Sequence, residues 1–335
     1  MSRRDAEVAL RAAGALGRRR VVATERLATH DRVVGAVLDD GTELVVKRDD
    51  GRRPGSRSAA AWARTMRAHE ESASALARRA PRVVGVDGSR RVAVWERCRA
   101  RPFADVLAGG AAARHVSARL GADLAELHAA GTVRSRRAPL ARPPSIHVFE
   151  PPTFDVLADA PGRDYARFYA HGQEVTAELR ALCAGWRTTA FVHGDLKCDN
   201  VLLGDDGSAV LVDWELAGLG DPMWDVGTVL GHYVHAWLSR VVPREGETLS
   251  TWLATTDPPF DAVRASAAAL WSGYGRVTPD DACRAAGYAA VFLLDRGFAS
   301  LWARGRLAAG TWLGVELAKS MLRDPRAGAG LLGAP

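Results

Sequence analysis

The arrangement of apolar residues changes along this chain, and the change divides it into two parts. Up to about residue 97 the apolar residues come in short, valine-rich runs, which are typical of β-strands. Five such runs occur, at residues 21–27, 33–38, 43–47, 81–88 and 91–98. Asp40-Gly41 separates the second run from the third and predicts a hairpin with a type I′ turn, because that turn needs a positive φ at both central residues.

After residue 97 the apolar residues mostly follow the 3.6-residue period of helices, as in the stripe of Leu120, Leu124 and Leu127. Helices are predicted over 102–131, 164–186 and much of 224–323, with a proline-rich loop over 132–162 and a frayed tail over 324–335. One helical segment, with Trp62, Met66, Ala73 and Leu76 on one face, also interrupts the strands. The sequence therefore predicts an α+β fold with a mostly β lobe at 1–97 and a mostly α lobe at 98–335.

The composition limits the class of protein. Hydrophobic residues make up 47% of the 335 residues, which is enough for a large core, yet no run approaches the roughly 20 apolar residues that span a bilayer. The four cysteines are scattered, without a C-x-x-C pair or a zinc-ligand spacing. We therefore expect a cytoplasmic protein without disulfides or structural zinc, and without a membrane segment.

The net charge of +6 raises the possibility of nucleic-acid binding. The excess lies in residues 1–110, which carry 23 Lys and Arg against 14 Asp and Glu. This segment lacks interleaved aromatic residues that would stack on bases, so we do not expect a nucleic-acid partner. A lobe that binds phosphate groups, or a drift towards arginine in a chain of this composition, explains the excess more simply.

A group of polar residues between two apolar runs carries the chemistry. His193, Asp195 and Asn200 follow the pattern H-x-D-x(4)-N, and Asp213 follows Asp195 by 18 residues at the end of the run AVLVD. Asn200 is the only asparagine of the chain, and Lys197 is one of only three lysines. Such a set suits phosphoryl transfer from ATP, because an aspartate and an asparagine supply oxygen ligands for Mg²⁺ while a second carboxylate accepts the proton of the attacking hydroxyl.

This chemistry gives each residue a predicted role. Asp195 is the catalytic base, Asn200 and Asp213 are the metal ligands, and Lys47 at the end of the third strand run holds the α- and β-phosphates of ATP. A carboxylate must hold this lysine, and Glu70 lies closer than Glu71 to the apolar stripe of the helical segment. We therefore predict Glu70 as its partner.

The neighbouring polar residues have structural interpretations. We expect His193 to shape the loop by packing and hydrogen bonding. For Asp221 and Asp225, in the segment GDPMWD, we favour helix capping and bracing of the loop over metal binding.

The motifs together resemble the aminoglycoside phosphotransferase and choline kinase group, which shares its fold with protein kinases. The resemblance covers roughly residues 20–310, and four segments carry it: ARLGADLAELHAAG at 118–131, HGDLKCDNVLL at 193–203, VDWE at 212–215 and GLGDPMWDVG at 218–227. It implies a bilobal protein-kinase-like fold, with ATP and Mg²⁺ as cofactors. The N-lobe at 1–97 would then bind the nucleotide, and the C-lobe at 98–335 would hold the catalytic loop and the acceptor.

The resemblance also implies further contacts with the nucleotide. The strand that ends near Glu96 would offer backbone groups to adenine. No G-x-G-x-x-G sequence precedes Lys47, so the turn LATHDR would serve in its place, through Thr29 and backbone amides.

Lys197 bears on the acceptor. Many small-molecule members of the group have another residue at this position, whereas Ser/Thr protein kinases have lysine, and a compact ammonium here would neutralise charge on the moving phosphoryl group. The segments VDWELAGLGDPMWDVGTVLGHYVHAWLSRVVP and ALWSGY resemble the kinase components of class V lanthipeptide and thioamitide biosynthesis. This resemblance implies a precursor-peptide substrate whose phosphorylated Ser or Thr is converted to a dehydroamino acid by a separate lyase partner.

Two alternatives stay open. A kinase of a small molecule, such as an aminoglycoside or other antibiotic or an amino alcohol, would use the same catalytic residues with a different acceptor pocket. A polycationic drug would be expected to meet an excess of carboxylates, yet residues 215–335 carry 12 acids against 11 bases. A non-catalytic pseudokinase would bind ATP and transfer nothing.

Overall fold

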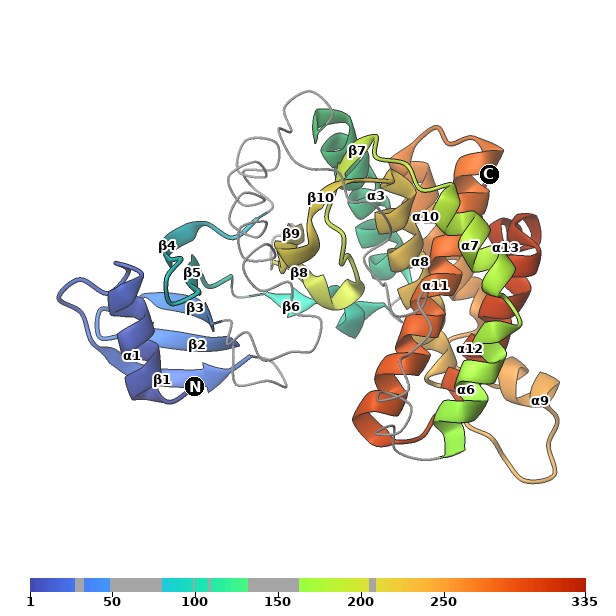
Figure 1. Cartoon of the computed structure of the whole chain (residues 1–335), viewed down its shortest axis with the longest axis horizontal. Helices are drawn as coiled ribbons and strands as arrows, with labels where there is room; N and C mark the ends of the chain where they lie inside the picture. The colour runs from blue at the N-terminus through green and yellow to red at the C-terminus, as the bar shows by residue number, and fades with distance from the viewer. Residues whose placement is uncertain (28–32, 49–79, 99, 108–109, 132–162, 205–208) are drawn as a thin grey trace. The chain divides into compact units, whose positions relative to one another are not determined.

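The computed structural model describes residues 1–27, 33–48, 80–98, 100–107, 110–131, 163–204 and 209–335. These residues form an α+β structure, as predicted (Figure 1). They group into two compact units: unit 1 consists of Met1–Arg101 and Leu202–Ala217, and unit 2 of Pro102–Val201 and Gly218–Pro335. The lobes at 1–97 and 98–335, with their separate functions, stay a prediction.

Unit 1 contains an antiparallel sheet with the strand order β1-β2-β3-β5-β4. Its strands are β1 (Val21–Arg26), β2 (Val33–Leu38), β3 (Glu43–Arg48), β4 (Val83–Asp87) and β5 (Val92–Glu96). All five lie where the valine-rich runs predict them. Two short strands of another sheet, β8 (Val201–Leu203) and β9 (Ala209–Leu211), lie side by side, and β6 (Arg101–Pro102) pairs with β8.

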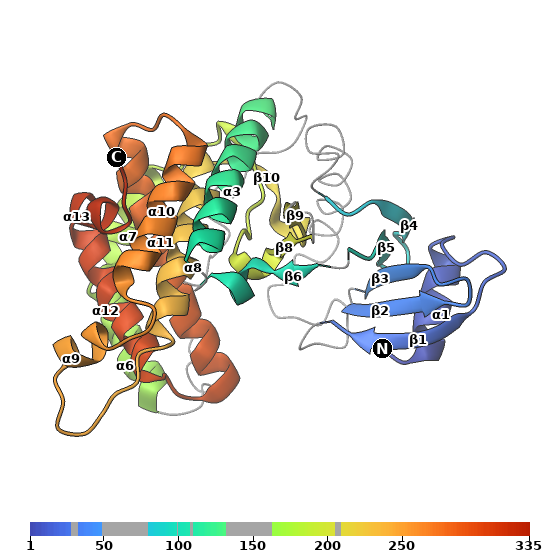
Figure 2. The same ribbon diagram turned by 180° about the vertical axis from the view of Figure 1, so that it is seen from behind.

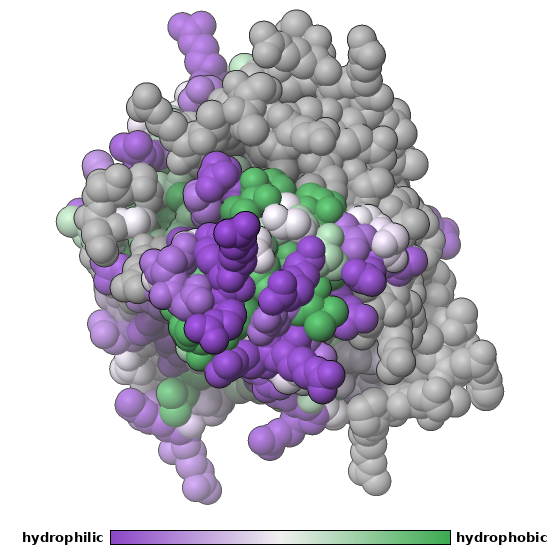
Figure 3. Space-filling model, turned by 90° about the vertical axis from the view of Figure 1, so that its left-hand side faces the viewer, coloured by the Kyte–Doolittle hydropathy of each residue, from purple (hydrophilic) through white to green (hydrophobic). Residues whose placement is uncertain are grey.

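Helix α1 (Arg3–Ala12) packs on the five-stranded sheet of unit 1. Ser2 and Asp5 form a capping box at its start, in which the hydroxyl of Ser2 accepts from the backbone N–H of Asp5 and the Asp5 carboxylate accepts from that of Ser2. Its apolar face joins the sheet in one buried core. In Figure 3 a small group of hydrophobic residues lies among hydrophilic ones, and the exposed apolar side chains of unit 1 include Val8 and Val22.

The hairpin between β2 and β3 forms where Asp40-Gly41 predicts it, but the predicted type I′ turn is wrong. The N–H of Gly41 donates to the carbonyl of Leu38 (3.0 Å), and among residues 38–41 only Gly41 has a positive φ, of 83°. This is a three-residue loop, in which a turn is followed by a glycine in the left-handed region. The loop begins one residue earlier than predicted, so Asp40 needs no strained backbone.

Unit 2 is mostly helical (Figure 2). Its helices of eight or more residues are α3 (Ala111–Gly131), α6 (Arg163–Gln173), α7 (Thr176–Ala184), α8 (Pro222–Leu238), α10 (Phe260–Tyr274), α11 (Pro279–Arg304) and α12 (Ala309–Arg323). Its shorter elements are η1 (Phe103–Val106), η2 (Cys198–Asn200), α9 (Leu249–Ala254), α13 (Pro325–Leu331) and the paired strands β7 (Ala190–Val192) and β10 (Gly218–Gly220). Helix α8 packs against α11, and α3 packs against α10.

Two glycines permit the close contact between α3 and α10. A Cβ atom on Gly273 would lie 1.8 Å from the carbonyl oxygen of Ala118, and one on Gly121 would lie 2.1 Å from that of Leu270. Side chains at either position would force the helix backbones apart. The contact matters for the site, because α3 and α10 each contribute a residue that supports the catalytic loop.

Two predictions about the helices of unit 2 are wrong in detail. The single helix expected over 164–186 is divided into α6 and α7 at Glu174-Val175. The tail expected to fray instead forms α13, and Leu332 after it is buried, with its carbonyl accepting from the Nε1–H of Trp271 (3.0 Å). An indole donor in the core needs a partner, and the tail supplies it.

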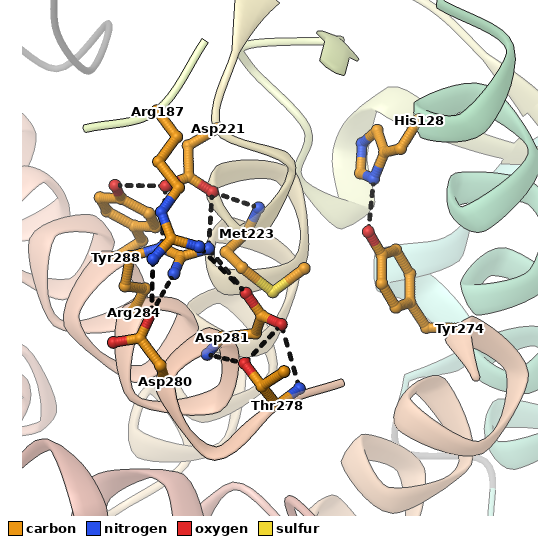
Figure 4. Close-up of polar contacts among 10 residues, drawn as sticks. All are labelled: His128, Arg187, Asp221, Met223, Tyr274, Thr278, Asp280, Asp281, Arg284 and Tyr288. Atoms are coloured by element: carbon orange, nitrogen blue, oxygen red, sulfur yellow. Dashed lines mark hydrogen bonds and ion pairs between the residues drawn. The ribbon is translucent and has the colours of Figure 1, made fainter. Parts of the chain in front are cut away.

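Asp221 joins the start of α8 to α11, as Figure 4 shows. Its carboxylate caps α8 by accepting from the N–H of Met223 (3.0 Å), and it also accepts from Nε of Arg284 (2.9 Å) and from the hydroxyl of Tyr288 (3.1 Å). Asp221 and Arg284 are both buried. The capping role expected for Asp221 is confirmed, and Arg284 is a partner that the sequence did not reveal. None of the helices in the described parts of the chain is long and apolar enough to cross a membrane.

Candidate active site

The loop between β7 and β8 carries the predicted catalytic residues. Both strands are short and apolar, so they anchor a polar segment at each end, and η2 forms its last turn. Gly194 has a φ of 83°, a conformation that a residue with a side chain rarely adopts. This backbone reversal directly precedes Asp195.

Within unit 2 the structure brings Asp195, Lys197 and Asn200 together. Nζ of Lys197 lies 2.8 Å from Oδ2 of Asp195, and Nδ2 of Asn200 donates to the same Oδ2 (3.2 Å) and to the carbonyl oxygen of Asp195 (2.8 Å). Both of these oxygens can only accept hydrogen bonds, so the NH₂ group of the Asn200 side chain must face them. Its Oδ1 is therefore left outside both bonds, as a metal ligand would be.

Helix α8 holds this loop in place. The buried carboxylate of Asp225 accepts from the N–H groups of His193 (2.7 Å) and Gly194 (3.0 Å), and Nε1–H of Trp224 donates to the carbonyl oxygen of Gly194 (2.9 Å). Nδ1 of His193 accepts from the N–H of Asp195 (3.3 Å). The bracing role expected for Asp225 and the shaping role expected for His193 are both confirmed.

Two further residues, which the sequence did not reveal, support Asp225. Nε2 of His128, on α3, lies 3.3 Å from Oδ2 of Asp225, and its Nδ1 lies 2.9 Å from the hydroxyl of Tyr274, at the end of α10. Figure 4 shows the contact between His128 and Tyr274. His128 lies in a segment that carried the family resemblance, but nothing in the sequence linked it to Asp225, and Tyr274 gave no signal.

A second pair of predicted residues meets in unit 1. The ammonium of Lys47, on β3, forms an ion pair with Oδ1 of Asp213. Asp213 has a left-handed backbone, with φ 66° and ψ 55°, which costs a residue other than glycine about 1–2 kcal/mol. The strand β9 ends at Leu211, and this backbone turn follows it two residues later. Strain of this kind is common at functional sites.

The other predicted nucleotide-binding residues give less information. Glu96 ends β5, is exposed, and forms an ion pair with Arg82 that lowers the pKa of the Glu96 carboxyl. Contact between its backbone and adenine stays a prediction. Thr29 and Glu70, together with the alternative Glu71, lie outside the described residues.

The donor set fits Mg²⁺ better than a transition metal. The described residues contain no group of three or more His, Cys, Asp or Glu side chains that could hold a metal ion. Mg²⁺ needs no such cage, because one or two protein oxygens and the phosphates of a nucleotide complete its coordination. Oδ1 of Asn200, in unit 2, and the carboxylate of Asp213, in unit 1, are each an oxygen donor of this kind; their joint binding of one ion stays a prediction.

Comparison with known proteins identifies the family of the chain. The model of the phosphotransferase enzyme family matches residues 28–264, which is more than half of the chain and includes both groups of residues. The chain belongs to the phosphotransferase enzyme family. It is therefore an enzyme that transfers phosphoryl groups, and the prediction of a kinase is confirmed.

Solved structures show the same fold at low sequence identity. A choline/ethanolamine kinase family protein from Mesorhizobium loti is 19% identical, with a TM-score of 0.54 over 93% of this chain and 92% of its own. Choline kinase LicA from Streptococcus pneumoniae is 14% identical, with a TM-score of 0.56 over 90% and 94%. A thermostable mutant of aminoglycoside phosphotransferase APH(4)-Ia is 15% identical, with a TM-score of 0.58 over 91% and 95%. These likenesses confirm the predicted protein-kinase-like fold.

Proposed function

We propose that this enzyme transfers the γ-phosphoryl group of ATP to a hydroxyl group, with Mg²⁺ as the required ion. The observation that carries the proposal is the contact of the Asp195 carboxylate with Lys197 and Asn200, on a loop that α8 holds in place. ATP as the donor is supported by the family match and by LicA, a relative in fold that has been solved in complex with AMP.

Each residue then has a role in the transfer. The acceptor oxygen forms a bond to the γ-phosphorus, the bond from that phosphorus to the β-phosphate oxygen breaks, and ADP leaves. Asp195 orients the acceptor hydroxyl and takes its proton. Lys197, already 2.8 Å from Asp195, places a positive charge beside the transferred group, and Lys47 binds the α- and β-phosphates.

Asn200 and Asp213 would hold Mg²⁺, which neutralises charge on the phosphates when it is bound. Asn200 is almost fully buried, at 7% exposure, and its amide is already oriented by Asp195. Asp213 is fixed by its backbone turn and by Lys47. Both ligands are thus positioned before the nucleotide arrives.

For the acceptor, our first candidate is a Ser or Thr hydroxyl of a ribosomal precursor peptide, phosphorylated so that a partner lyase can eliminate the phosphate. The contact of Lys197 with Asp195 supports this candidate, because it places an ammonium where Ser/Thr protein kinases have one. A small hydroxyl compound is the second candidate. The likeness in fold to a choline kinase and to an aminoglycoside phosphotransferase favours it.

The test is intact mass spectrometry of reactions that contain ATP and Mg²⁺. One arm holds a Ser/Thr-rich peptide encoded beside this gene, and a second holds a panel of aminoglycosides and choline. We expect the peptide to gain a phosphate and Asp195→Asn to reduce the rate by about 10²–10⁴ while nucleotide binding, measured by calorimetry, survives. Asp199→Asn is the matched control, because Asp199 is an exposed carboxylate of the same loop.

The outcomes separate the candidates. Phosphate on a small molecule alone would replace the first candidate by the second. Nucleotide binding without transfer to any acceptor would indicate a pseudokinase. Full activity of Asp195→Asn would show that the base is misassigned.

A further inference from the structure

Next to the catalytic loop, α8 and α11 form a patch that consists of His232, His235, Phe292 and Arg296. Nδ1 of His232 accepts from the N–H of Cys198 in the loop (3.2 Å). The ring of His232 stacks on Phe292, with 5.6 Å between centroids and 25° between planes, and the guanidinium carbon of Arg296 lies 5.1 Å from the Phe292 centroid. Contacts within unit 2 therefore lead without a gap from the catalytic loop to Arg296.

The guanidinium of Arg296 has bonding capacity left over. Its Nη2 forms a 2.5 Å ion pair with Asp295, the preceding residue of the same helix. Its Nε is buried and has no acceptor among the described residues. A buried donor without a partner is costly. Adjacent residues of a helix point in different directions, so Asp295 does not bond all the N–H donors of the Arg296 guanidinium. Arg296 is still 29% exposed, which leaves it accessible to a ligand.

Charged groups of both signs surround the two histidines of the patch. Burial, followed by the positive charge of Arg296 and Lys197, lowers the pKa of His232 to about 4. Burial, followed by His232 and Arg296, lowers the pKa of His235 to about 4, against the opposing effect of Asp199. Both histidines are therefore neutral near pH 7, and the cations that face the patch are Lys197 from the loop, Arg296 from α11 and, further along α11, Arg304.

Three carboxylates also act on Arg296. Burial lowers the pKa of its guanidinium, and Asp295, Asp195 and Asp199 together outweigh burial and raise it. Asp295 is paired with Arg296 itself, Asp195 is paired with Lys197, and Asp199 is exposed to solvent. Arg296 thus lies within electrostatic reach of the predicted catalytic base.

We infer that the acceptor carries a carboxylate close to its reactive hydroxyl, and that Arg296 binds this carboxylate through its terminal nitrogens. A planar guanidinium binds a carboxylate with two parallel hydrogen bonds, and at 29% exposure Arg296 has donors beyond its Nη2 pair with Asp295 for such an interaction. The inference rests on the proposed hydroxyl phosphotransferase and narrows its substrate class. In a peptide, the acceptor would be a Ser or Thr with an acidic neighbour.

The test uses acceptor pairs that differ in one charge. Two serine peptides differ only in Glu or Gln beside the serine, and glycerate is compared with glycerol and with choline. Rates of ADP release give kcat/KM for the wild type, for Arg296→Gln, and for Arg264→Gln, which removes the same charge from an exposed position of α10. Binding of the corresponding peptides with Ala in place of Ser, measured by fluorescence anisotropy with ADP present, reports recognition without transfer.

We expect the wild type to prefer the acidic member of the productive pair by about tenfold or more in kcat/KM. Arg296→Gln should bring this preference to within about twofold, chiefly by lowering kcat/KM for the acidic member, while Arg264→Gln keeps the preference. Equal rates with both members, a preference that survives Arg296→Gln, or faster turnover of choline than of glycerate would each overturn the inference.

The binding arm separates this inference from the proposed function. If no acceptor is phosphorylated but the Glu peptide binds the wild type more tightly and Arg296→Gln removes the difference, the proposed function fails and anion recognition by Arg296 stands. If transfer occurs without any preference for the acidic acceptors, the proposed function stands and the inference fails. If neither transfer nor charge-dependent binding occurs, both fail.

Discussion

Protonation of His232 should make this protein lose stability in mild acid. His232 is 8% exposed, and its imidazole has a pKa of about 4, chiefly because burial disfavours the charged form. In the unfolded chain the pKa returns to the ordinary histidine value of 6.5. Above pH 6.5 the group is neutral in both states. As the pH falls from 6.5 to 4 only the unfolded state binds the proton, so the stability contribution is lost over this window.

The size of the effect follows from the two pKa values. A difference of about 2.5 units corresponds to about 3 kcal/mol in the limit of low pH, since one unit is 1.36 kcal/mol. Between pH 7 and pH 5 the linkage relation gives a loss of about 2 kcal/mol in the free energy of unfolding. A loss of this size is a large share of the stability of a typical domain.

Urea unfolding at pH 7, 6 and 5 measures the loss directly. His232→Asn removes the titrating group but keeps a side-chain acceptor for the N–H of Cys198. The wild type should lose about 2 kcal/mol more than this variant between pH 7 and pH 5. His115→Asn, at an exposed position of α3, should follow the wild-type curve. Parallel curves for the wild type and His232→Asn would refute the reasoning.

Three further predictions concern the support of the site. Asp225→Asn leaves one of two backbone donors of the catalytic loop without its acceptor. It should lower the free energy of unfolding, measured in urea, by about 2–4 kcal/mol and should also lower kcat. Unchanged kcat would contradict the bracing role. Gly273→Ala should lower the melting temperature because its Cβ has no room, whereas Gly172→Ala in α6, where a Cβ meets nothing within 4 Å, should raise stability by about 0.5–1 kcal/mol. Truncation after Arg323 removes the buried Leu332 and should shift the urea midpoint downward; an unshifted midpoint would mean that the tail contributes nothing.

Local sequence signals predicted much of unit 1 and the catalytic loop. The valine-rich runs placed five strands correctly, because strand propensity and the period of two are properties of neighbouring residues. The predicted turn type was wrong because the loop begins one residue earlier than expected. The same Asp-Gly pair can occur in a two-residue or a three-residue loop, and only the register of the paired strands selects between them. The tail was expected to fray, as chain termini often do, but its contact with a tryptophan 61 residues earlier gives it a place in the core.

The sequence by itself determined which chemical groups the enzyme has and how they are spaced. Asp195, Lys197 and Asn200 meet because they lie within one short loop, so their spacing was sufficient to predict the group. Only the tertiary structure decided what holds and tunes that loop. Asp225 and His232 of α8 contact the loop directly, and His128 of α3 contacts Asp225. These contacts depend on how distant helices pack, which no local pattern encodes.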